Sequence, residues 1–260
     1  MTQAAASLAP FLAHLPADLF RLLLVFARVA GAVMLLPGLG EQVVPAPIRL
    51  ALALALTVLL APVLGTMPAL PAAPLDLLRL IAAETVTGLW LGFLARTLAL
   101  ALPVAGGLAA GALGLANVLQ PDTAIGPSAS ALATGLSRAI PALVLATNLQ
   151  VPLLRALARS YALVPVGQVL PQPSLRTVLP GVAEAFMLSL RLAAPFLLAG
   201  LLWSALLGLA ARLVPRLQVY FAALPGQVLA GLLLLAGLAP VLLAFWTRAM
   251  ADGFARLAGQ

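Results

Sequence analysis

Residues 191–212 read RLAAPFLLAGLLWSALLGLAAR and hold twenty uncharged residues between Arg191 and Arg212. A helix that spans a bilayer needs about 20 apolar residues, so this stretch is long enough to cross a membrane. Its leucine and alanine content favours a helix over a strand. We therefore expect a transmembrane helix over Leu192–Ala211.

Working outward from this stretch, the spacing of charges and prolines marks further hydrophobic segments. They cover Leu22–Leu36, Leu50–Leu64, the residues from Asp76 to Leu102 before Pro103, Ala139–Leu154 and Leu217–Thr247. None shows the alternation of a membrane β-barrel. The sequence thus predicts an all-α, multi-pass membrane protein of about six hydrophobic helical segments. The chain has 22 prolines, several of them within or beside these segments, so we expect kinked helices and helical hairpins.

The composition points to the same class of protein. Of the 260 residues, 63% are hydrophobic and only 8% are charged, and the mean hydropathy is +1.15. An ordinary globular domain has about 25% charged residues, so a soluble enzyme, a secreted module and a disordered tail are excluded. The first 16 residues lack a basic region, and we expect no cleaved signal peptide.

The residues needed for several kinds of chemistry are missing or scattered. The chain has no cysteine and one histidine, His14, and no two of its seven acidic residues are closer than eight positions. We therefore expect neither an enzyme nor a metal or cofactor site. All 14 basic residues are arginines, and they are spread along the chain with few aromatic residues between them, which argues against nucleic-acid binding despite the net charge of +7.

Five charged residues lie within or at the edges of the hydrophobic segments. Charges at membrane depth are costly unless they face protein or water. These five residues either line a substrate pathway in a transporter or belong to helices that pack inside an oligomer. We expect them to form contacts between helices or between subunits. These residues are Arg28, Glu84, Arg96, Glu184 and Arg191.

The stretch Gly106–Ser130 is a long segment with a single charged residue, Asp122, and it does not read as a clean helix. It reads GGLAAGALGLANVLQPDTAIGPSAS and is rich in glycine. Backbone that is not helical cannot face lipid, so we interpret it as a re-entrant segment or a loop lined by protein or water, with an ordinary extramembrane connection as the alternative. The GxxxG pairs Gly88/Gly92 and Gly107/Gly111 favour close helix contacts.

Short motifs in a fixed order run along most of the chain. They are Arg28, Pro37-Gly38, Pro45 and Arg49-Leu50-Ala51-Leu52; then Glu84, Gly88, Gly92 and Ala105-Gly106; then Ser160, Tyr161, Pro165 and Gly167; and finally Ala193-Ala194-Pro195, Arg212, Pro215, Tyr220-Phe221 and Pro225. With these motifs the chain resembles the FliR/SctT family of type III secretion export-gate subunits.

This resemblance implies a fold like a fusion of two smaller gate subunits, with a FliP-like part over 1–170 and a FliQ-like helical hairpin over 171–260. It implies a structural, non-enzymatic subunit of the flagellar protein export gate, which forms part of the inner-membrane channel for unfolded flagellar proteins at the flagellar basal body. The implied partners are FliP-like, FliQ-like, FlhB-like and FlhA-like export components and the unfolded export substrates. The alternatives are an injectisome (SctT-type) gate subunit and, from another class, a small-molecule secondary transporter.

The resemblance also implies that the segment around residues 106–130 is the plug of the closed channel. The candidate plug or pore residues are Gly106, Gly107, Gly111, Gly114, Asn117, Pro121, Asp122 and Gly126.

Overall fold

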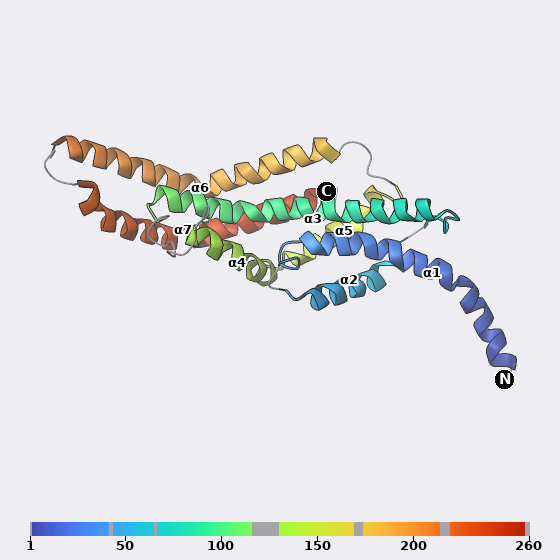
Figure 1. Cartoon of the computed structure of the whole chain (residues 1–260). Coiled ribbons are helices and arrows are strands. Elements are labelled where there is room, and N and C mark those ends of the chain that lie inside the picture. The colour runs from blue at the N-terminus through green and yellow to red at the C-terminus, as the bar shows by residue number, and fades with distance from the viewer. Residues whose placement is uncertain are drawn as a thin grey trace. The chain divides into compact units, whose positions relative to one another are not determined.

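The computed structural model describes residues 2–41, 44–64, 67–115, 130–168, 174–213 and 219–257. These residues form seven α-helices and, within those ranges, no strand (Figure 1). In chain order the helices are α1 (Thr2–Leu35), α2 (Ala46–Leu60), α3 (Pro74–Ala112), α4 (Ala131–Ala146), α5 (Gln150–Leu163), α6 (Ser174–Leu213) and α7 (Val219–Leu257).

Three of the described helices have stretches long and apolar enough to cross a membrane: Pro74–Ala112, Leu179–Leu213 and Ala223–Arg256. The pair α4 and α5 makes a fourth if its two parts count as one broken span. The prediction of an all-helical, multi-pass membrane protein is confirmed, and the helix expected over Leu192–Ala211 lies within α6.

The prolines interrupt the helices less than the sequence suggests. We expected the third segment to end before Pro103, but α3 continues through this proline to Ala112. Both α6 and α7 also contain two prolines each. The flanking leucines and alanines are strong helix formers. A proline removes one hydrogen bond, whereas ending the helix in an apolar environment would leave several backbone groups without partners. The helix therefore persists.

The segment expected over Ala139–Leu154 is wrong as a single helix, because α4 ends at Ala146 and α5 begins at Gln150. Between them Asn148 has a φ of 56°, a left-handed conformation that asparagine tolerates better than most residues. The amide of Leu149 donates to the carbonyl of Val144 at 3.0 Å, and that of Asn148 to Leu145 at 3.3 Å. These two bonds form a Schellman motif, which closes α4.

The chain divides into two compact units, each made of separate parts of the sequence. Unit 1 comprises Met1–Arg96, Val144–Leu179 and Gly253–Gln260, and unit 2 comprises Thr97–Leu143 and Pro180–Asp252. Neither unit follows the expected boundary near residue 170, so the division into a FliP-like and a FliQ-like part stays a prediction.

In unit 1, α1 and α3 pack with their backbones in close contact. A Cβ atom added at Gly88 would meet the backbone of Arg28 and Ala32, and one at Gly92 would meet Ala32 as well. On the opposite helix, a Cβ at Gly31 would meet the carbonyl oxygen of Thr85. The GxxxG pair Gly88/Gly92 therefore lies at a contact between two helices that glycine alone allows.

Replacing Gly88 by alanine is expected to lower the stability of the purified protein by about 1–3 kcal/mol, because the added methyl group pushes α1 away from α3. The matched control is Gly111→Ala, since a Cβ at Gly111 meets no atom within 4 Å. The thermal unfolding midpoints of both variants in detergent check this prediction. Equal midpoints would mean that the glycine contact contributes nothing.

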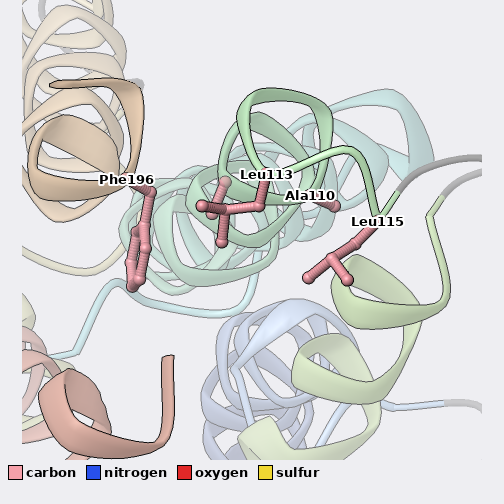
Figure 2. Close-up of a cluster of buried hydrophobic side chains, with 5 residues drawn as sticks. Ala110, Leu113, Leu115 and Phe196 are labelled. Carbon is pink, nitrogen blue, oxygen red and sulfur yellow. The ribbon is translucent and has the colours of Figure 1, made fainter. Parts of the chain in front are cut away.

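Unit 2 has its own hydrophobic core, at the end of α3. The core residues are Ala109, Ala110, Leu113, Leu115 and Phe196, and partly buried leucines of α7 pack against them. Figure 2 shows Leu113 and Phe196 in this cluster. A Cβ at Gly200 would meet Ala112, so α6 also approaches α3 closely. This core holds α3, α6 and α7 together at the point where α3 ends.

Candidate functional site

A fully buried ion pair lies inside unit 1. Arg28 of α1 and Glu84 of α3 are both 0% exposed. The guanidinium donates from Nε to Glu84 Oε2 at 2.7 Å and from Nη2 to Oε1 at 3.1 Å. This is the two-pronged geometry in which arginine binds a carboxylate most strongly.

The C-terminal end of α5 completes the surroundings of this pair. Nη1 of Arg28 donates to the carbonyl of Val164 at 2.9 Å and to that of Ser160 at 3.2 Å. The Ser160 carbonyl lies in the last turn of α5 and also accepts the amide of Val164 at 2.9 Å, whereas the Val164 carbonyl lies just beyond the helix, where backbone oxygens lack partners within it. The ring of Tyr161 lies 4.2 Å from the guanidinium carbon, a cation–π contact.

Glu84 also has a second donor. The backbone amide of Gly167 donates to Glu84 Oε1 at 2.8 Å, and Gly167 itself has a φ of 85°, which favours glycine. The turn after α5 is thereby attached to α3. This cluster joins α1, α3 and the end of α5, and it leaves neither charge without partners. Its members are the buried Arg28, Glu84, Ser160 and Tyr161 and the partly buried Val164 and Gly167.

The other three predicted charges lie elsewhere. Arg96 pairs with Glu41 at 3.6 Å, and both side chains are partly exposed, at 32% and 20%. Glu184 and Arg191 lie on α6 in unit 2, and both are exposed. The structure thus brings Arg28 and Glu84 together, whereas Arg96 is bound to a loop residue that we had not singled out.

The predicted plug segment begins later than expected. Gly106, Gly107 and Gly111 are not loop residues but part of α3, which ends only at Ala112. The alanines and leucines between these glycines sustain the helix. A Cβ at Gly106 would meet Leu136 of α4, so glycine is needed here for close packing between α3 and α4 and not for a loop.

The end of α3 is a second Schellman motif. Gly114 has a φ of 72°; the amide of Leu115 donates to the carbonyl of Ala110 at 2.9 Å, and that of Gly114 to Gly111 at 3.4 Å. Leu115 is 2% exposed and belongs to the core cluster with Ala110, the apolar contact that accompanies this motif (Figure 2). The chain therefore leaves α3 from a fixed position.

The chain enters α4 from a fixed position as well. Ser130 is its N-cap: the amide of Ala133 donates to the Ser130 hydroxyl at 3.2 Å, a bond that satisfies one of the free amides at a helix start. The remaining candidate plug residues, Asn117, Pro121, Asp122 and Gly126, lie outside the described residues. Residues 116–129 thus connect two helix ends that unit 2 holds in place.

In the described part of the chain, no group of three or more histidine, cysteine, aspartate and glutamate side chains is placed to hold a metal ion. The polar groups that the structure does bring together are bound to one another: the Arg28 cluster joins helices, and the caps at Gly114 and Ser130 end them. Their arrangement stabilises helix packing and holds the two ends of the segment 116–129.

The fold and these contacts define an all-helical, multi-pass membrane protein in which a buried ion pair joins helices. Residues 19–253 match the family model described as "Bacterial export proteins, family 1", and the chain belongs to this family. It is 34% identical over 215 residues to the flagellar biosynthetic protein FliR of Caulobacter vibrioides, a match that covers 82% of this chain and 86% of that protein. It is 27% identical over 227 residues to FliR of Bacillus subtilis, covering 84% and 86%.

Proposed function

We propose that this protein is a structural subunit of the flagellar protein export gate and forms part of the inner-membrane channel for unfolded flagellar proteins. The observation that carries the proposal is the match of residues 19–253 to the bacterial export family, together with two relatives that are both named as flagellar FliR proteins. These two names favour the flagellar system over the injectisome and over a small-molecule transporter.

The proposed partners are FliP-like and FliQ-like subunits, which would pack on this chain, and FlhB-like and FlhA-like export components. Exposed apolar side chains support such packing: on α6 and α7 they include Leu198, Leu201, Leu206, Leu229 and Leu233, each at least 58% exposed. Surfaces of this kind face lipid or other apolar helices. We propose that the parts over 1–170 and 171–260 take FliP-like and FliQ-like positions in the gate.

We further propose that residues 116–129 form the plug of the closed channel. The supporting observation is the pair of caps at Gly114 and Ser130, which hold both ends of this segment on helices of unit 2. A segment attached at two fixed points can close a pore and move aside without disturbing the helices that carry it. In this proposal Gly106 and Gly107 are α3 residues that face α4, and Gly111 is an α3 residue whose added Cβ would meet no neighbour.

Deleting the gene is expected to abolish swimming and filament assembly, because the export channel would lack a wall subunit. Motility in soft agar and electron microscopy of filaments measure this, with plasmid-borne expression of the intact protein as the control that restores both. A deletion strain with normal filaments would overturn the proposal. Small-molecule uptake into liposomes by the purified protein alone would favour the transporter instead.

A further inference from the structure

A groove of about 270 Å³ runs between α1 and α2 in unit 1. It is lined by apolar side chains of both helices and by one charged residue, Arg49. The two helices run antiparallel. Arg21 precedes the groove residues of α1, and its side chain donates to the carbonyls of Ala61 and Leu64, which lie just beyond the C-terminal end of α2. Arg49 therefore lies at the end of the groove that is next to the turn between the helices.

The guanidinium of Arg49 has a buried N–H group that no described residue binds. Its Nε is buried and has no hydrogen-bond partner in the described part of the chain. A buried guanidinium N–H without an acceptor is unfavourable, because it has lost water and gained nothing in return. This N–H group is therefore available to an acceptor that the described residues do not supply, and the positive charge of the guanidinium favours an anionic one.

The start of α2 adds a second positive feature at the same place. Pro45 caps the helix without a side-chain hydrogen bond, and the first turn contains no acidic residue. Within the described residues, neither a cap bond nor an acidic residue of the first turn offsets the partial positive charge at this helix N-terminus. Arg49 lies in the first turn, so the helix end and the guanidinium favour an anion at one position.

The rest of the groove favours an apolar chain. Phe26 and Val33 line it from α1 and Leu50 lines it from α2. Leu50 and Leu54 are 52% and 48% exposed, so the outer surface beside the groove is apolar too. With only 15 residues, α2 is too short to span a bilayer. An occupant with an anionic group at one end and a hydrocarbon tail matches this surface.

We infer that the α1–α2 groove binds an anionic phospholipid, with its phosphate at Arg49 and an acyl chain along Phe26, Val33 and Leu50. Basic residues between membrane helices hold lipid phosphates in this manner, and arginine suits phosphate geometry. A single lipid molecule supplies both the charge and the apolar chain. This site goes beyond the proposed export function and does not depend on it.

The test is native mass spectrometry of the protein, or of the assembly with which it co-purifies, extracted from membranes in mild detergent and supplied with phosphatidylglycerol. Arg49→Gln is expected to retain about tenfold less phosphatidylglycerol than the unchanged protein, which corresponds to the loss of one charged hydrogen-bonding partner. The matched control is Arg155→Gln, which removes an exposed arginine of unit 1 that lies outside the groove. Its lipid retention is expected to stay the same.

Two further variants keep the inference falsifiable if Arg49→Gln folds poorly. Arg49→Lys is expected to keep most of the bound lipid, and Ala30→Phe, which fills the groove without touching the charge, is expected to lose it. Equal retention in Arg49→Gln and the unchanged protein would overturn the inference. Displacement of the lipid by inorganic phosphate alone would also overturn it. If Arg49→Gln kept its lipid but lost a co-purifying protein, the inference would be overturned as well, and the result would point to an acidic partner helix.

Discussion

Replacing Glu84 by alanine is expected to lower the stability of the fold by about 3–5 kcal/mol, the largest effect of any single substitution that we predict. The change leaves the fully buried Arg28 guanidinium without its anion, and a buried charge without a partner is strongly destabilising. It also frees the amide of Gly167, which donates to Glu84. The amount of protein in membranes and its thermal unfolding midpoint in detergent measure the effect.

Two controls distinguish the effect of breaking the buried ion pair from the effect of removing any carboxylate. Glu41→Ala removes a carboxylate that is partly exposed and 3.6 Å from Arg96, and it should cost less than about 1 kcal/mol. The double variant Arg28→Met with Glu84→Met removes both charges at similar volume and should recover much of the lost stability. If Glu84→Ala is as stable as the unchanged protein, or the double variant is no more stable than Glu84→Ala, the buried pair does not stabilise the packing of these helices.

The distribution of charges predicted the helices well and their ends poorly. Uncharged stretches identify where a chain is apolar: Leu192–Ala211 lies within α6 and most of Leu217–Thr247 lies within α7, although α6 begins earlier, at Ser174. Helix ends depend on local backbone geometry, which composition does not reveal. Pro103 looked like an end and is not one, whereas Asn148, an unremarkable residue in an apolar stretch, ends α4 because it adopts a left-handed conformation.

In the candidate site, the sequence indicated the individual charged residues but not which residues contact them. Arg28 and Glu84 were recognisable as charges in apolar segments, but they are 56 positions apart, and Ser160 is 132 positions from Arg28. No spacing rule connects such residues. Ser160, Tyr161 and Gly167 belong to a motif that the family resemblance singled out, so they could have been proposed as site residues. The motif alone does not indicate that they contact the Arg28–Glu84 pair.

The glycines near the proposed plug were harder to interpret, because glycine serves two purposes. At Gly106 it permits a close approach of α3 and α4, and at Gly114 it adopts a φ of 72° that ends α3. Composition predicts an irregular segment in both cases. The hydrogen bonds of the backbone decide between them, and they place the helix end at Gly114 and not at Gly106.

Replacing residues 117–128 by a glycine–serine linker of the same length is expected to make the closed gate leak, with a several-fold increase in ion permeability of membranes that contain the assembled gate. The linker keeps the Gly114 and Ser130 caps, so the helices on both sides remain in place. It removes the side chains that would fill the pore. Conductance in planar bilayers, or the growth of cells that express the variant in the presence of normally excluded solutes, measures the leak.

The outcome depends on comparing this variant with one that changes α3 near the same segment and leaves residues 117–128 intact. Gly111→Ala adds a methyl group in open space on α3 and should leave permeability unchanged. A leak in both variants would trace to the helix and not to the loop. An intact assembly with the glycine–serine linker and no leak would mean that another part of the gate closes the channel, and the two fixed caps would then serve only to join α3 to α4.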